Sequence, residues 1–296
     1  MLPLSRRRLA ILSIVAPAMV FFVLLDVIGC SSINEQIGPD QRMQRSLDAH
    51  KEVARQFEKQ QDWASYAKAQ NNLGIIYRMQ AERGIEPELH LQRSLDVLKE
   101  AARLDEEKQD WTSYSVVQNN LGSTYRVLAQ RGVKAERNLQ RSLDAHKEAA
   151  RRSDEQQDWA NYTGAQHNLG VTYRVLAQHG IEPAQNLQRS LDALQEAARR
   201  FEEDGDLAAY SKTQNSLGVT YRVLAERDIE PAQNLQRALD AFKEAARLDE
   251  EQQDWMHYAG AQNNLGATYQ VLAQRGVEPE KNLKLATQAF KEASAH

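Results

Sequence analysis

Apolar residues recur along most of the chain at spacings of three and four, which places them on one side of a helix. One such stripe consists of Trp111, Tyr114, Val117, Leu121, Tyr125 and Leu128. A second consists of Leu235, Leu239, Phe242 and Ala246. Acidic and basic residues alternate on the opposite side of the second stripe, which is typical of a solvated helix face. The pattern predicts amphipathic helices and an all-α protein.

Local signals predict where these helices begin and end. Asp110 stands directly before the first stripe as an N-cap, and Gly132 follows it as a C-terminal stop. The segment Gly84-Ile85-Glu86-Pro87 separates two helical patterns, and its proline suits the first turn of the second helix. Each unit is therefore predicted to be an antiparallel helix pair.

The sequence aligns with itself at an offset of 48 residues. Gln-Asn-Asn-Leu-Gly at residues 70–74 recurs, with at most one substitution, from residues 118, 166, 214 and 262. The same offset relates Met43, Leu91, Leu139, Leu187, Leu235 and Leu283. A fixed period of this size is typical of a solenoid. The predicted units are 43–90, 91–138, 139–186, 187–234 and 235–282, with a terminal part-unit 283–296.

These units resemble the tetratricopeptide repeat. Leu73-Gly74 and Tyr77 match the signature of its first helix, while Ser94, Leu98 and Ala101 match the small, bulky, small series of its second. The resemblance covers residues 43–296 and implies a right-handed α-solenoid of five helix-turn-helix repeats, with an extra N-terminal helix and about eleven helices in all. The repeats of the family are usually about 34 residues long, whereas the period of this chain is 48 residues. In this respect the chain resembles the long-period variants of the family.

Two further residue types recur at the repeat period, glycine in all five repeats and tryptophan in four of them. Gly74 and its equivalents lie in mid-helix, where glycine costs about 1 kcal/mol relative to alanine, so we expect close helix approach there. A tryptophan opens the first helix of four repeats, and Leu207 replaces it in the fourth. We expect Trp63, Trp111, Trp159 and Trp255 to be core side chains rather than a platform for stacking or sugar binding.

The first thirty residues predict export. Arg6, Arg7 and Arg8 precede a mostly apolar run of 20 residues from Leu9 to Ile28, which is typical of a signal segment at 1–29. Residues 27–30, Val-Ile-Gly-Cys, resemble the lipobox of bacterial lipoproteins, which implies cleavage before Cys30 and lipid attachment to it. The alternative is an uncleaved signal anchor, because about 20 apolar residues span a bilayer. Both alternatives place the repeats outside the cytoplasm, behind a polar tether at 30–42.

Composition and motifs exclude several classes of function. A net charge of −4 and a pI near 6.0 argue against nucleic-acid binding, which needs unopposed basic clusters. One cysteine permits no internal disulfide and no thiolate metal site. Histidines with metal-ligand spacing, nucleophile elbows, phosphate loops and dinucleotide fingerprints are absent from the sequence. We therefore predict no catalytic residue, no metal and no cofactor.

The resemblance also implies a place for a partner. In tetratricopeptide proteins the first helices line a concave groove that receives peptides or helices. The matching positions are Asn71, Arg78, Asn119, Arg126, His167, Arg174, Asn215, Arg222, Asn263 and Gln270. The four arginines suit carboxylates or carbonyls of an extended ligand. The alternative is internal pairing, with Glu82 four residues after Arg78 and Glu226 four residues after Arg222.

Together these features predict a non-catalytic scaffold or adaptor for proteins of a bacterial envelope complex, attached to a membrane. The alternative is a recruitment or sensor subunit that binds peptides, glycan strands or another anionic ligand in the groove. An enzyme is the third and least favoured class. The apolar side of the last helix, with Ala286, Phe290 and Ala293, leaves self-association open.

Overall fold

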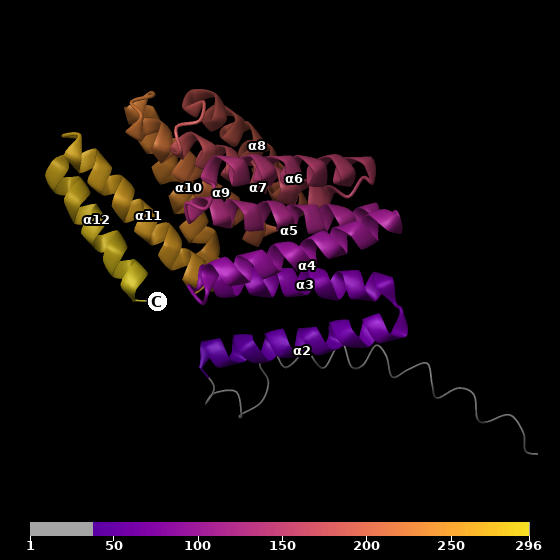
Figure 1. Ribbon diagram of the computed structural model, residues 1–296. Helices are drawn as coiled ribbons and strands as arrows, with labels where there is room; N and C mark the ends of the chain where they lie inside the picture. The colour runs from indigo at the N-terminus through magenta and orange to yellow at the C-terminus, as the bar shows by residue number, and fades with distance from the viewer. Residues whose placement is uncertain (1–37, 296) are drawn as a thin grey trace, which may run out of the picture. The chain divides into compact units, whose positions relative to one another are not determined.

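The computed structural model describes residues 38–295, and all regular secondary structure in that range is α-helical. Eleven helices follow one another in this range, and Figure 1 labels them in chain order. They are α2 (Pro39–Gln60), α3 (Trp63–Glu82), α4 (Pro87–Glu107), α5 (Trp111–Gln130), α6 (Ala135–Glu155), α7 (Trp159–Gln178), α8 (Pro183–Asp204), α9 (Leu207–Glu226), α10 (Pro231–Glu251), α11 (Trp255–Gln274) and α12 (Pro279–Ser294). The predicted all-α class is confirmed. Because α2 begins at Pro39, the last four residues of the predicted tether are helical.

The described chain divides into two compact units at Leu104 and Asp105. In the first unit, α2 packs against α3 around a cluster that includes Leu47, Leu73 and Tyr77. On α4 of the same unit, the Ser94 hydroxyl donates to the Gly74 carbonyl of α3 at 2.7 Å. The first unit therefore has the same helix-on-helix construction that the repeat pattern predicts.

The second unit contains α5 to α12, and each helix packs against the next in the chain. The odd-numbered helices also contact one another, α5 with α7, α7 with α9, and α9 with α11, whereas the even-numbered helices of this unit make no such contacts. The odd-numbered helices of this unit are therefore closer to one another than the even-numbered helices are. This arrangement is an α-solenoid of tandem helix pairs.

Capping residues begin and end the helices as predicted. Asp62, Asp110, Asp158, Asp206 and Asp254 each accept a hydrogen bond from the backbone N–H three residues later, at 3.0–3.2 Å. Glycines with φ between 78° and 84° follow four of the odd-numbered helices, which are α3, α5, α7 and α11. After α9 this place is taken by Asp228, with φ 57°. The left-handed backbone there costs glycine least.

The recurring mid-helix glycine lies where two helices touch. A Cβ added at Gly170 would lie 2.5 Å from Leu194 Cγ and 3.0 Å from the Ser190 carbonyl oxygen. The other four equivalents each face the residue 24 positions later in the same way, at 2.5–2.6 Å. The pairs are Gly74 with Leu98, Gly122 with His146, Gly218 with Phe242 and Gly266 with Phe290. The expected close approach is confirmed.

Buried asparagines connect four of the linkers to the helices that follow them, a role that was not predicted from the sequence. Their side-chain Nδ2 groups donate to the carbonyl of the residue five positions earlier, at 2.7–2.8 Å. These residues are Asn138, Asn186, Asn234 and Asn282. The residue before each helix is non-glycine with φ between 37° and 42°, an unfavourable conformation that this bond helps to hold. The recurrence of asparagine every 48 residues was the available signal.

Candidate partner-binding surface

The solvent-facing side of α5, α7, α9 and α11 is called the inner surface below. Eight of the ten predicted partner-binding residues lie on these four helices, and Asn71 and Arg78 lie on α3 of the first unit. Because the period is constant, the eight occupy equivalent positions on successive helices. Neighbouring odd-numbered helices are in contact, so these positions follow one another across the surface.

The amides of this surface hold neighbouring helices together. Asn119 Oδ1 on α5 accepts a hydrogen bond from Asn168 Nδ2 on α7 at 3.0 Å, and it lies 2.8 Å from His146 Nδ1. On α9, Asn215 Oδ1 accepts from Asn264 Nδ2 of α11 at 2.9 Å. Asn263 and Gln270 on α11 are exposed. The predicted row of amides is therefore in part a set of helix-to-helix hydrogen bonds.

His167 links α7 to α9, since its Nδ1 lies 2.9 Å from Thr213 Oγ1. Burial lowers the pKa of His167 to about 4, and the positive charges of Arg126, Arg174 and Lys212 contribute to the lowering. The imidazole is therefore neutral at physiological pH. Neutral histidine at this place matches the uncharged asparagine of the other repeats.

We expect the stability of the protein to fall as the pH falls from about 6.5 to about 4. In that window the unfolded chain protonates His167 while the folded protein keeps it neutral, so folding loses up to about 3 kcal/mol. His167→Asn, which installs the residue of the equivalent positions, should remove this part of the pH dependence. Urea unfolding of both proteins at pH 7 and pH 4.5 measures the difference. Parallel pH profiles would contradict the assignment.

The arginines of the surface differ in their partners. Arg78 Nε lies 3.9 Å from Glu82, and Arg222 Nε lies 3.6 Å from Glu226, so both make long ion pairs on their own helices. Arg174 makes no ion pair within the described residues, and burial together with nearby Arg222 lowers its pKa to about 10. It remains charged at neutral pH. The internal pairing considered for Arg78 and Arg222 is present, and it leaves Arg174 without a counter-charge.

The four inner helices are cationic although the chain is acidic overall. Their charged residues are Arg126, Arg174, Lys212, Arg222 and Glu226. The remaining acidic residues of the second unit lie on the even-numbered helices and the connecting segments, where many pair with arginines. The charge of the chain is thus segregated, with positive charge on the inner surface.

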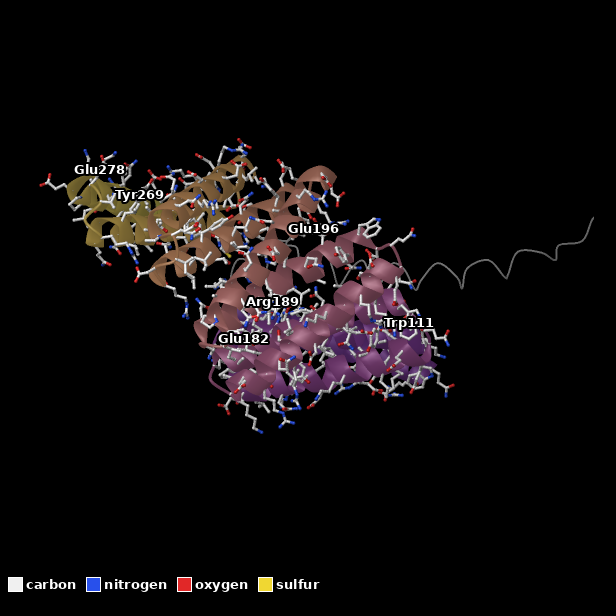
Figure 2. All side chains as sticks on the ribbon, turned by 90° about the horizontal axis from the view of Figure 1, so that it is seen from above. Trp111, Glu182, Arg189, Glu196, Tyr269 and Glu278 are labelled. Atoms are coloured by element: carbon white, nitrogen blue, oxygen red, sulfur yellow. The ribbon has the colours of Figure 1, made fainter. Side chains whose placement is uncertain are left out.

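The tryptophans are not core side chains, contrary to the expectation from the apolar stripe. Trp63, Trp159 and Trp255 are exposed, with 44% of Trp159 accessible, and Trp111 is partly buried. Each stands edge-on to the tyrosine three residues later, with ring centroids 5.7–6.1 Å apart. As the first residue of its helix, each tryptophan lies at the rim of the repeat. Figure 2 shows Trp111 at such a rim.

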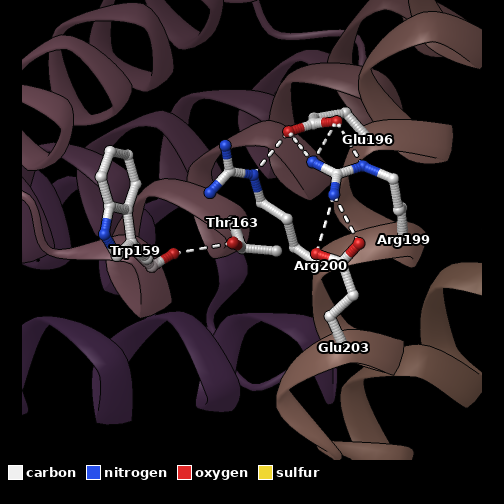
Figure 3. A network of polar contacts seen from close by, with 6 residues as sticks. All are labelled: Trp159, Thr163, Glu196, Arg199, Arg200 and Glu203. Atoms are coloured by element: carbon white, nitrogen blue, oxygen red, sulfur yellow. Dashed lines mark hydrogen bonds and ion pairs between the residues drawn. The ribbon is translucent and has the colours of Figure 1, made fainter.

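Arginines from the following helix cover two of these rings. The Arg152 guanidinium carbon lies 3.7 Å from the ring centre of Trp111, and that of Arg200 lies 5.0 Å from Trp159. In Figure 3, Glu196 bridges Arg199 and Arg200, and Glu203 binds Arg199. These contacts, some exposed and some partly buried, are satisfied within the protein, so we assign them to structure rather than to ligand binding.

The described residues include no group of three or more potential metal-binding side chains close enough to share an ion. Within residues 38–295, no helix has both the length and the apolar character needed to cross a membrane. Cys30 and the predicted signal segment lie outside the described residues, so both remain predictions.

Comparison with known proteins adds little to this description. No protein-family model matches the chain, and no curated protein matches it. One solved structure that aligns with it is described as a circular tandem repeat protein with novel repeat topology and enhanced subunit contact surfaces. The two chains are 11% identical, with a TM-score of 0.37, and the alignment covers 94% of this chain and 70% of the other. The class of the protein, an α-solenoid of tandem helix pairs, follows from its own helix packing.

Proposed function

We propose that this protein is a non-catalytic scaffold or adaptor that binds another protein along its inner surface and is held at a membrane outside the cytoplasm. The observation that carries the proposal is the repetition of one helix pair, with all odd-numbered helices of the second unit on one side. Such stacking makes a long, continuous surface suited to a large partner. A catalytic centre needs a particular constellation of groups, whereas equivalent residues recur here in each repeat.

The resemblance to tetratricopeptide repeats supports the same proposal, because that family uses its first helices for partner binding. The first helix of each repeat corresponds here to an odd-numbered helix. The membrane attachment is supported by residues 27–30 and the apolar run before them. A lipid on Cys30 would hold the repeats near the membrane surface.

A photo-crosslinking experiment tests the binding surface. We expect a photoreactive residue at Gln270, which is exposed on α11, to capture a partner protein in cells. The matched control is Lys243, which is exposed on α10, and it should capture much less. Capture through Lys243 alone would place the partner on the even-numbered helices and contradict the proposal. The absence of any captured protein at both sites would remove the scaffold role.

Intact mass and membrane fractionation test the attachment. We expect the native protein to begin at a lipidated Cys30 and to sediment with membranes, and Cys30→Ala to abolish both properties. An unprocessed chain that stays in the membrane fraction after this substitution would identify an uncleaved signal anchor. That result would discard the lipoprotein assignment and leave the binding surface unaffected.

The second candidate function is recruitment or sensing through a short peptide, a glycan strand or a small anionic ligand. The cationic inner surface favours it, since the four helices α5, α7, α9 and α11 carry three arginines and one lysine but only one acidic residue. The two candidates differ in the size of the bound molecule. A scaffold yields crosslinks over several repeats, whereas a sensor binds a short ligand and loses it when the arginines are replaced.

A further inference from the structure

The second unit exposes apolar side chains at one of its edges. Four of the six large apolar side chains that are exposed in this unit stand in the first two residues of α7, α9 or α11, and they are Trp159, Leu207, Trp255 and Met256. Met256 is 81% exposed, the highest value among the large apolar side chains of the described residues. Exposed apolar side chains that gather in one place commonly mark an interaction site.

The ends of several helices meet at this edge. Near the start of α9, the Ser211 hydroxyl donates a hydrogen bond to Asp249, which lies near the end of α10, at 2.5 Å. Near the start of α11, the Tyr258 hydroxyl donates to Glu292 of α12 at 3.4 Å. Helices α9 and α11 also pack directly against each other. Leu207 and Met256 therefore belong to one edge of the unit.

The chain around these apolar side chains is strongly acidic. Residues 201–207 and 249–256, which connect α8 to α9 and α10 to α11, contain eight acidic residues and no lysine or arginine. Six of the eight are exposed, namely Glu202, Glu203, Asp204, Asp206, Glu250 and Glu251. These two segments are called the acidic rim below.

Part of this negative charge is not balanced within the protein. Arg199 and Arg247, on α8 and α10, pair with Glu203 and Glu251 of the rim. Three other exposed carboxylates of the rim make no ion pair within the described residues, and they are Glu202, Asp204 and Glu250. The rim therefore offers free carboxylates beside exposed apolar side chains.

Departures from the repeat pattern make this edge more negative. In two helix pairs an arginine lies over the rim tryptophan, as Arg200 does over Trp159 (Figure 3). The equivalent residue on α10 is Leu248, which is buried. At the end of α8, Asp204 stands where Gln156 and Gln252 stand in the neighbouring repeats. One position has lost a cation and another has gained a carboxylate.

The tyrosines beside the rim are affected by the same charge. Burial is the main cause that raises the pKa of Tyr210, and Glu202 and Glu244 add to the increase. Burial also raises the pKa of Tyr258, with additions from Glu292 and Glu250. Carboxylates act in this way because they disfavour a second negative charge nearby.

A molecule that fits this surface has to supply positive charge together with apolar side chains. The free carboxylates repel phosphate groups, which disfavours an anionic lipid surface or a nucleic acid. A guanidinium group over a tryptophan ring is already found at this edge, with Arg152 3.7 Å from the ring centre of Trp111. We propose that the acidic rim binds a basic segment of a partner protein in which bulky apolar residues stand between arginines and lysines. The basic side chains pair with the free carboxylates, and the apolar ones cover Leu207 and Met256.

The acidic rim is separate from the inner surface of the proposed function. Leu207 precedes Asn215 by eight residues, which corresponds to about 12 Å along a helix. The inference adds a second binding surface and does not depend on what the inner surface binds. If crosslinking through Gln270 and Lys243 captures nothing but a basic peptide binds as expected, the proposed scaffold role fails and the acidic rim stands.

Fluorescence anisotropy of labelled peptides on the full chain in non-ionic detergent tests the proposal. The probe is a nonapeptide of three Arg-Leu-Lys units. One reference peptide has serine in place of each leucine, and a second has glutamate in place of each arginine and lysine. Low salt is used because ions screen these contacts.

Two variants of the rim each have a matched control at the opposite edge of the same unit. The charge variant combines Glu202→Gln, Asp204→Asn and Glu250→Gln, and its control combines Glu136→Gln, Glu230→Gln and Glu280→Gln, which are also exposed. The apolar variant combines Leu207→Ser and Met256→Ser, and its control combines Val277→Ser and Leu283→Ser, with 45% and 52% exposure. All these side chains are exposed, and circular dichroism verifies that each variant keeps the helical content of the wild type.

We expect the charge variant and the apolar variant each to bind the probe at least tenfold more weakly than the wild type. Both controls should stay within about twofold of the wild type, and the serine peptide should bind at least tenfold more weakly than the probe. Equal losses in the charge variant and its control would mean unspecific attraction and overturn the proposal. Equal binding of the probe and the serine peptide would overturn the apolar contact, and tighter binding of the glutamate peptide would overturn the basic occupant.

Sedimentation of the unlabelled protein tests the rival occupant, a second copy of this chain. We expect the apolar variant to have the same oligomeric state as the wild type. Self-association of the wild type that the apolar variant abolishes, and that its control retains, would assign the acidic rim to contacts between copies and overturn the proposal.

Discussion

Leu235→Ala should lower the free energy of unfolding by about 3 kcal/mol, within the range of fully buried leucine truncations. Leu235 is 1% exposed at the start of α10, and its counterparts Leu91, Leu139 and Leu187 are completely buried. Truncation removes apolar contacts and leaves a cavity that the packed helices on both sides cannot fill. Urea unfolding of the full chain, followed by circular dichroism, measures the change.

The chain supplies a matched control at the equivalent position. Leu283 on α12 occupies the same place in the repeat but is 52% exposed. Leu283→Ala should therefore cost less than about 1 kcal/mol, because little apolar surface leaves water when this side chain folds. A similar cost for both truncations would show that neighbour packing does not determine the stability of these positions.

The second large effect concerns the contact between α7 and α8. Gly170→Val should destabilise the protein by on the order of 3 kcal/mol, because the added atoms would overlap Leu194 and approach the Ser190 carbonyl. The leucine side chain can move, but the backbone carbonyl cannot move without shifting α8. The helix pair would therefore separate or distort.

Gly164 and Gly260 provide the comparison for this substitution. An added Cβ at Gly164 would have its nearest neighbour at 4.0 Å, and at Gly260 it would meet nothing within 4 Å. Alanine at either position should stabilise the protein by up to about 1 kcal/mol, since it favours the helix without a clash. Thermal unfolding of the three variants measures both signs. Stabilisation by Gly170→Val would rule out the close-packing role of the recurring glycine.

Much of the fold could be predicted from the sequence because its signals are local. Spacings of three and four, aspartates before helices, prolines at their first turns and glycines after them each act within a few residues. The constant period then repeats the same solution, so the solenoid follows from one unit. The close contact at Gly74 could also be predicted, because a mid-helix glycine carries a local cost that only packing offsets.

The candidate surface could be predicted only in part. The register placed Arg126, Arg174 and Arg222 at equivalent positions, but their pairing depends on which side chains approach from other helices. Glu226 reaches Arg222, and Arg174 remains without an ion-pair partner within the described residues. The sequence also could not show that Asn119 and Asn215 connect helices, because their partners lie 49 residues away.

The sequence by itself determined the helices, their ends, the period and the class of fold, since those features depend on interactions within one repeat. The tertiary structure decided which members of an apolar stripe are covered and which buried polar atoms find partners. Trp159 continues the stripe yet lies at the rim, and Asn234 is polar yet buried. Burial depends on the positions of neighbouring helices, and periodicity within one helix carries no information about where those neighbours end.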